Sequence, residues 1–256
     1  MNFGMSFWPA PYTSALSLTF DDGLPSHLEI AIPELDCRGL RGTFYINPRG
    51  DDDEYSLTSW RRQLAHWIPA AQAGHEMGNH SLQHPCSLNI PLDWAPNLLD
   101  MTLAELEQDL REAQRRISAM FPMQKATSFA YPCYETSLGR GLSRVSYVPL
   151  IARLFAAGRA RGELANDPQY CDLHCLSSMN AERQTAAFLI GLAELSLAQG
   201  RWAILTFHGI NEGHLPVAGV DFIEFLDHLV RRRAQIWVAP VAEVATYIQE
   251  RQHSSS

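Results

Sequence analysis

The stretch Leu16-Ser-Leu-Thr-Phe-Asp-Asp-Gly23 decides the fold and the site that we expect. The apolar run from Ala15 to Phe20 predicts a short buried strand that ends at two carboxylates and a glycine. Gly23 lets the backbone turn sharply, and successive side chains leaving a strand point in opposite directions. Asp21 and Asp22 can therefore serve two partners around one point, one carboxylate holding a metal and the other moving a proton. Taken alone, the same residues would also suit an ordinary turn at a strand end.

Composition limits the kinds of protein that this chain can be. Its 256 residues, 46% of them apolar, suit a single α/β domain with a large core. A formal net charge of −8 argues against binding nucleic acid or an anionic membrane by charge. No stretch is long and apolar enough to span a bilayer. The first residues do not resemble a secretory signal, so we expect a cytoplasmic protein, or a secreted one if a signal has been removed.

The cysteines show no framework-like spacing. Five cysteines, an odd number, predict reduced thiols. The segment from Cys171 to Cys175 invites a zinc-site interpretation, but a second ligand pair is missing. Alternation along this segment favours a half-buried strand instead.

Strand-like and helix-like segments alternate along the chain. This order predicts a parallel sheet covered by helices, and the number of strands for this length indicates a barrel or near-barrel. The clearest helix is expected over 103–120, where Thr102 and Glu105 fit a capping box. We predict one domain over 14–250, an N-terminal extension over 1–13 and a disordered tail over 251–256. The expected strands lie at 15–20, 42–47, 127–132, 173–177, 202–207 and 236–239.

Unusual polar residues follow several of these strands, where parallel α/β barrels carry their sites. His80 and His84 are four residues apart, and on a helical turn both rings would face one side. Two imidazoles and one carboxylate bind Zn²⁺ or a similar divalent ion and leave positions open. Such an ion can activate water and polarise a carbonyl. One carboxylate would then accept the water's proton, and His208 would protonate the leaving group.

Each of these residues also has an ordinary structural interpretation. Two histidines four apart are commonly surface or capping residues, and His208 alone suits a core position at a strand end. The combination of residues favours a site.

These segments resemble the polysaccharide deacetylase family, also called the NodB-homology or carbohydrate esterase family 4 domain. Thr19-Phe-Asp-Asp-Gly23 resembles its first motif, and His80-Ser-Leu-Gln-His84 resembles its second, His-Ser/Thr-x-x-His. Leu205-Thr-Phe-His208 resembles the last motif, a strand that ends in the catalytic histidine. The similarity covers about residues 14 to 250, and the first two motifs in this order are highly specific.

The resemblance implies a distorted (β/α)7 barrel with a divalent metal held by Asp22, His80 and His84. It also implies that Asp21 is the base and His208 the acid. The metal would be Zn²⁺, with Co²⁺ and Ni²⁺ as alternatives. The reaction would be hydrolysis of a non-peptide carbon–nitrogen bond, namely the N-acetyl group of a sugar, or of an O-acetyl ester in some members.

The third motif departs from the family pattern. The family's Arg-Pro-Pro-Tyr is replaced by Ala130-Tyr-Pro-Cys133, so the backbone donor to the tetrahedral oxygen would be the N–H of Cys133. In the family the arginine orients the base, and Ala130 cannot do this. We hypothesise that Arg161 pairs with Asp21 instead, although Arg159 is equally placed by sequence. The family's tryptophan-bearing fourth motif is not evident, which leaves the polysaccharide open.

Other functions use the same residues. A small-molecule amidase or O-acetyl esterase of this fold would explain the lack of a secretion signal. Iron oxygenases also use two histidines and a carboxylate, but usually on an all-β frame. A non-catalytic sugar-binding relative is disfavoured because every proposed catalytic group is present. The expected partner is an acetylated carbohydrate, and the oligomeric state stays open.

Overall fold

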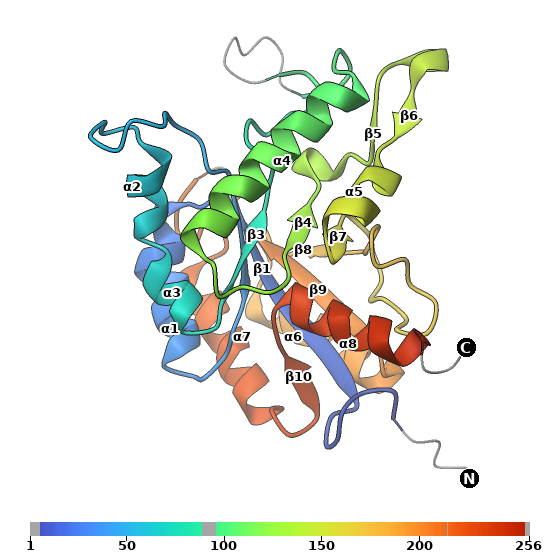
Figure 1. The fold of residues 1–256 in the computed structure, drawn as a ribbon. Coiled ribbons are helices and arrows are strands. Elements are labelled where there is room, and N and C mark those ends of the chain that lie inside the picture. Colours follow the sequence, from blue (N-terminus) through green and yellow to red (C-terminus); the bar gives the residue numbers. More distant parts are fainter. Residues whose placement is uncertain (1–5, 89–95, 214, 254–256) are drawn as a thin grey trace.

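A curled parallel sheet forms the centre of the molecule in this computed structural model, which describes residues 6–88, 96–213 and 215–253 (Figure 1). Its strands follow the order β7-β4-β3-β2-β1-β9-β8, and β10 pairs separately with β1. Each pairing between them is parallel. The strands are β1 (Ser14–Asp21), β2 (Thr43–Ile46), β3 (Glu76–Asn79), β4 (Ser128–Ala130), β7 (Ala157–Arg159), β8 (Met179–Asn180), β9 (Trp202–Phe207) and β10 (Ile236–Val238).

The two ends of this sheet meet through the segment that precedes β8. The N–H of Leu176 donates to the carbonyl of Gly158, and the N–H of Ala160 donates to the carbonyl of Leu176. Strand β10 pairs only with the first half of β1, from Ser14 to Leu16, so it stays outside the ring. The structure therefore confirms the predicted distorted (β/α)7 barrel in a single domain.

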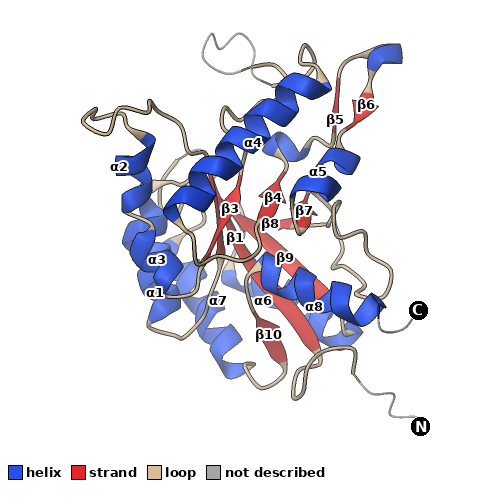
Figure 2. Cartoon of the chain, in the orientation of Figure 1, coloured by secondary structure: helices blue, strands red, loops and turns tan. Residues whose placement is uncertain are grey.

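Helices cover the outer face of the sheet (Figure 2). Among the described residues, no helix is long and apolar enough to cross a membrane. The helices are α1 (Ile32–Asp36), which continues the π-helical turn η1 (His27–Ala31), α2 (Trp60–Ala65), α3 (Ile68–Gln72), α4 (Leu103–Met120), α5 (Val148–Leu154), α6 (Ala186–Gln199), α7 (Gly219–Arg231) and α8 (Val241–His253). A hairpin of β5 (Ser137–Leu138) and β6 (Val145–Ser146) projects from the body, and two short 3-10 turns are η2 (Pro132–Tyr134) and η3 (Gly141–Ser143).

Strand β1 is buried along its whole length. Leu18 and Phe20 join the apolar core beneath the helices. Because side chains alternate along a strand, Thr19 and Asp21 lie on the opposite face, inside the barrel. Thr19 donates its hydroxyl to the carbonyl of Leu205 there. The alternation of apolar and polar residues thus places one carboxylate of the predicted site in the barrel interior.

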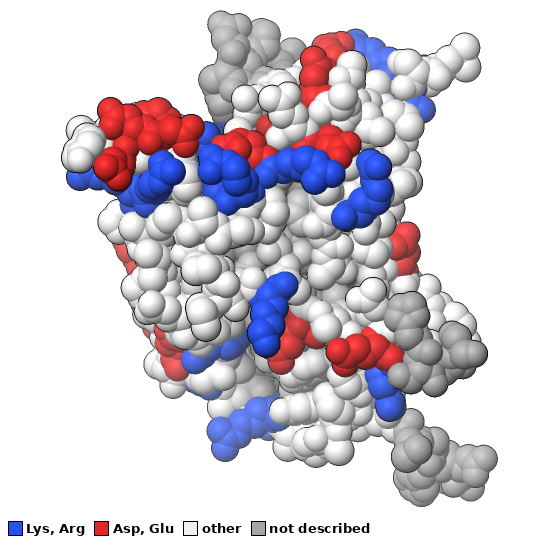
Figure 3. Space-filling view, viewed as in Figure 1, with Lys and Arg blue, Asp and Glu red and all other residues white. Residues whose placement is uncertain are grey.

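Helix α4 matches the sequence prediction at both ends. Its bounds are Leu103–Met120, and Thr102 and Glu105 form the predicted capping box. Arg111 and Arg115 pair with glutamates on the same helix. Arginine and acidic side chains accordingly lie next to one another across this face of the molecule (Figure 3).

The predicted disordered tail and the predicted strand near Cys175 need correction. Helix α8 runs to His253, so three residues of the predicted tail are helical, while 254–256 lie outside the described residues. Part of the N-terminal extension packs on the domain, because Trp8 is buried and its indole N–H donates to the carbonyl of Gly200; residues 1–5 lie outside the described part. The segment from Cys171 to Cys175 forms turns instead of a strand, and both thiols are free.

Candidate active site

Asp21 and Asp22 take different directions at the end of β1. Asp21 is the last residue of the strand and only 3% exposed inside the barrel. Asp22 has a φ of 76° and Gly23 a φ of 62°, which turns the chain away at once. The side chain of Asp22 is 32% exposed. The two carboxylates therefore point in different directions, as the sequence predicted; one is buried and the other stands at the mouth of the barrel.

The loop that carries His80 and His84 follows β3. It is irregular, since Ser81 and His84 have φ values of 64° and 54°, so the predicted helical turn is wrong. Polar side chains hold the loop in place of helical hydrogen bonds. The amide of Asn47 donates to the carbonyls of His80 and Ser81, and the carboxylate of Asp109 in α4 accepts the N–H groups of residues 82 and 83.

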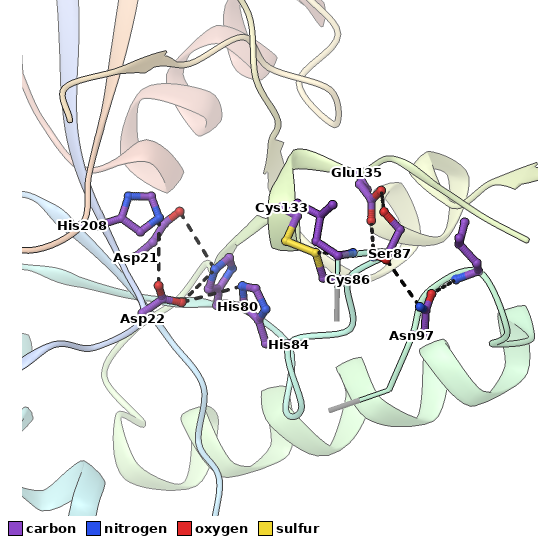
Figure 4. Close-up of a disulfide and its surroundings, with 12 residues drawn as sticks. Asp21, Asp22, His80, His84, Cys86, Ser87, Asn97, Cys133, Glu135 and His208 are labelled. Carbon is purple, nitrogen blue, oxygen red and sulfur yellow. Dashed lines mark hydrogen bonds and ion pairs between the residues drawn. A yellow bond between two sulfur atoms is a disulfide. The ribbon is translucent and has the colours of Figure 1, made fainter. Parts of the chain in front are cut away.

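The two imidazoles nevertheless converge on Asp22 (Figure 4). The Nε2 atoms of His80 and His84 lie 3.6 and 3.7 Å from the same Oδ1 of Asp22. Nδ1 of His80 lies 2.9 Å from the carbonyl of Ala130, to which it can only donate, so Nε2 keeps its lone pair. Burial lowers the pKa of each histidine to about 4, which keeps both imidazoles neutral. One donor atom from each residue lies within 4.8 Å of the others, and this donor set fits a divalent cation.

Arg159, not Arg161, is the partner of Asp21. Its Nη2 donates to both carboxylate oxygens at 2.6 Å, and its guanidinium lies over the rings of Tyr45 and Tyr134, at 5.0 and 5.4 Å from their centroids. Burial pushes the pKa of Asp21 up, but Arg159, with smaller contributions from His80 and His208, outweighs burial and the pKa is lowered. Arg161 lies on the exposed surface. The sequence did not distinguish the two arginines as partners of Asp21. The structure does, because Arg159 lies in strand β7 and points into the barrel.

His208 follows β9 and faces the same centre. Its Nε2 lies 4.0 Å from Oδ2 of Asp22, and its Nδ1 lies 3.3 Å from a carboxylate oxygen of Glu182. Burial pushes the pKa of His208 down, but Glu182 and the two aspartates outweigh it and the pKa is raised. Behind it, Nε2 of the buried His27 donates to the carbonyl of His208. The sequence did not reveal Glu182, which follows the two-residue strand β8.

Comparison with known proteins agrees with this geometry. The family model described as polysaccharide deacetylase matches residues 11–137, which include both carboxylates and both imidazoles of the cluster. The chain belongs to the polysaccharide deacetylase family. The sequence matches none of the curated proteins with which it was compared.

Solved structures of polysaccharide deacetylases share the fold over nearly the whole chain. A Mycobacterium smegmatis protein assigned to this family is 17% identical, with a TM-score of 0.59 over 96% of this chain and 93% of that one. The Bacillus subtilis peptidoglycan deacetylase PdaC is 14% identical, with a TM-score of 0.54 over 94% and 95%. A family 4 acetyl xylan esterase from Clostridium thermocellum, solved with a cobalt ion, is 16% identical, with a TM-score of 0.53 over 91% of both chains.

The polysaccharide deacetylase fold does not by itself establish catalysis. A Bacillus anthracis protein described as a family 4 pseudoenzyme shares it, with 15% identity and a TM-score of 0.50 over 91% of this chain and 65% of that one. Activity therefore depends on whether the side chains of this chain can perform the reaction.

The third motif of this chain contains one cysteine of a disulfide. Cys133 is bonded to Cys86, so the prediction of reduced thiols holds only for Cys37, Cys171 and Cys175. The two halves lie 47 residues apart in sequence and meet because the loops after β3 and β4 are neighbours. A count of cysteines carries no information about such a pairing. The role of the Cys133 N–H as a backbone donor stays a prediction.

Proposed function

We propose that this protein is a metal-dependent hydrolase that removes acetyl groups from a carbohydrate. One observation carries the proposal: Asp22, His80 and His84 bring three metal-type donor atoms within 4.8 Å of one another, beside a buried carboxylate held by an arginine. A second carboxylate next to such a cluster is what an activated water requires as a proton acceptor.

Asp22, His80 and His84 are the residues that would hold the cation, and Zn²⁺, Co²⁺ and Ni²⁺ all suit two imidazoles and a carboxylate. When bound, a divalent ion lowers the pKa of water and polarises a carbonyl. Metal dependence is also in keeping with the cobalt ion in the structure of the acetyl xylan esterase.

Asp21 is the proposed base. The lowered pKa keeps its carboxylate ionised, and Arg159 fixes its orientation through two hydrogen bonds. One oxygen of Asp21 lies 4.0 Å from Nε2 of His80, so the base adjoins the proposed metal site. Asp21 would accept the proton of the water that attacks the acetyl carbon.

His208 is the proposed acid. Its raised pKa keeps the imidazolium populated towards higher pH, and Glu182 holds Nδ1 so that Nε2 faces the site. His208 would give a proton to the departing nitrogen of an N-acetyl sugar, or to the oxygen of an O-acetyl ester. The backbone N–H of Cys133 would donate to the oxygen that becomes negative on the tetrahedral carbon.

Acetate release from a panel of substrates tests the proposal. The panel contains N-acetylated and O-acetylated oligosaccharides together with small acetamides and acetate esters. We expect release from at least one acetylated saccharide, loss of release with a chelator, and near-complete loss in Asp21→Asn without loss of metal. Turnover of small amides alone would favour the small-molecule amidase, and a fully active Asp21→Asn would remove the base from the mechanism.

We also propose that the protein works in an oxidising compartment and not in the cytoplasm. Buried disulfides persist mainly in secreted, periplasmic or cell-surface proteins, and Cys86 is fully buried in its bond with Cys133. Alkylation of free thiols in fractionated cells tests this: a protein found only in the cytoplasmic fraction with five reactive thiols would contradict it.

A further inference from the structure

We infer that the Cys86–Cys133 disulfide is a positioning element that makes deacetylation conditional on oxidation. The inference rests on the proposed function, because it concerns the turn that carries the proposed backbone donor. In the oxidised protein the disulfide would hold this turn in the conformation needed for catalysis. Reduction by a dithiol would let the turn relax.

The disulfide joins two loops of the site. Cys86 lies two residues beyond His84, and Cys133 lies in the turn η2 directly after β4 (Figure 4). A second link runs beside it, in which Glu135 accepts hydrogen bonds from the N–H and the hydroxyl of Ser87. The loop that follows the proposed metal ligands is thus tied to the loop that carries the proposed donor.

The turn has a backbone shape that its sequence does not favour. Cys133 and Tyr134 have φ values of 50° and 60°, two successive residues in the left-handed region without a glycine. Residues with a side chain rarely adopt this region, and such conformations persist where the surroundings enforce them. A covalent bond at the first of the two residues is a direct means of enforcement.

Two site features depend on this turn. The orientation of the Cys133 N–H follows from the φ and ψ angles of residues 132 and 133. The ring of Tyr134 covers the guanidinium of Arg159, whose Nη2 holds Asp21. Relaxation of the turn would therefore move the backbone donor and uncover one face of the ion pair that orients the base.

The metal ligands have their own supports. The loop of His80 and His84 is held by Asn47 and by Asp109, which do not belong to the turn. We therefore expect reduction to lower kcat while metal affinity is kept. This separates a role in positioning the donor from a general role in holding the fold.

The chemistry of the switch is thiol–disulfide exchange. Cys86 is fully buried and Cys133 only partly, so a thiolate of the dithiol attacks the sulfur of Cys133 and Cys86 leaves as a thiolate. The second thiolate of the dithiol then displaces Cys133, which takes up a proton. The protein gains two electrons and two protons, and the dithiol becomes a cyclic disulfide.

The test starts from a variant in which Cys37, Cys171 and Cys175 are replaced by serine. These thiols are free and take no part in the site, so the variant keeps the disulfide and removes side reactions. Its kcat, KM and Zn²⁺ affinity are measured for three samples. The first is the oxidised protein, the second is the protein reduced with dithiothreitol and then alkylated, and the third is the protein reduced with dithiothreitol and then reoxidised. Cys86→Ala in the same background gives a second route to the broken bond.

We expect kcat to fall about 100-fold on reduction, the usual cost of losing one oxyanion donor. KM and Zn²⁺ affinity should stay near those of the oxidised form, and reoxidation should restore kcat. An unchanged kcat in both the reduced protein and Cys86→Ala would overturn the inference. So would loss of Zn²⁺ binding together with kcat, because the disulfide would then support the fold and not the donor.

Hydrogen exchange of backbone amides gives a readout that needs no activity. Peptides that cover residues 131–135 should exchange faster after reduction, while peptides from β9 should not change. If the oxidised protein releases no acetate but these peptides still respond, the proposed function fails and the positioning role stands. If exchange is unchanged on reduction, the inference fails whatever the activity.

Discussion

Replacing Arg159 by methionine should leave the buried carboxylate of Asp21 without its counter-ion. Arg159 is completely buried and gives two hydrogen bonds of 2.6 Å to Asp21, which is itself 3% exposed. Methionine fills similar space without charge or donors, so the Asp21 carboxylate would lose its counter-ion in an environment of low polarity. The structure predicts that both stability and the ionisation of the base depend on this one side chain.

The magnitude follows from these contacts. A hydrogen bond to a charged group contributes about 1.5–3 kcal/mol, and two of them suggest about 3–6 kcal/mol. Removing one partner of a buried ion pair typically costs about 3–5 kcal/mol. We therefore expect the free energy of unfolding to fall by about 3–5 kcal/mol. Arg161→Met, on the exposed surface two residues further on, should cost less than about 0.5 kcal/mol.

Urea unfolding at pH 7 and a pH profile of kcat form the assay. Without Arg159, burial is opposed only by the weaker effects of His80 and His208, so the pKa of Asp21 rises and the acid limb of the profile should move to higher pH. In the wild type the pKa is lowered, so the stabilisation is present above the ordinary aspartate pKa and is lost as pH falls through the depressed value. Equal unfolding free energies for the two variants, or an acid limb that stays in place, would refute the reasoning.

Two further predictions concern His208 in the site and His27 behind it. Glu182→Gln removes the carboxylate whose hydrogen bond and charge help the two aspartates to raise the pKa of His208, so the basic limb of the kcat profile should shift to lower pH; a limb that does not move would exclude His208 as the acid. Burial lowers the pKa of His27 to about 4. As the pH falls, the unfolded chain therefore binds a proton at this residue near pH 6.5, whereas the folded chain binds it only near pH 4. The wild type should therefore lose about 3 kcal/mol of stability between about pH 6.5 and 4 through this residue. Urea unfolding of His27→Gln over the same range should show a shallower loss, and parallel curves would contradict the assignment.

The sequence was most informative where chemistry and local structure coincide. The strand that ends in Asp21-Asp22 and the pair His80 and His84 were found because each motif occupies a few consecutive residues. The helical turn expected for the second motif was wrong, since Asn47 and Asp109 support the loop from a distance. Spacing alone could not show this, because side chains from other elements replace the helical hydrogen bonds.

The residues that the sequence left undecided or missed depend on long-range structure. Arg159 lies in a strand of three residues, and Glu182 follows a strand of two residues. In strands this short, the alternation of apolar and polar residues does not show which side chains point into the barrel. Only neighbouring strands in the sheet orient them towards Asp21 and His208. The Cys86–Cys133 bond likewise needed the spatial contact of two loops.

Binding of Zn²⁺ to the metal-free protein, followed by calorimetry and elemental analysis, tests the central claim most directly. We expect one ion per chain in the wild type and in Asp21→Asn, and a large loss of affinity in His80→Ala and His84→Ala. His66→Ala, which alters an exposed histidine at the end of α2, serves as the control and should bind as the wild type does. No binding by the wild type, or undiminished binding by His80→Ala and His84→Ala, would contradict the proposed metal centre.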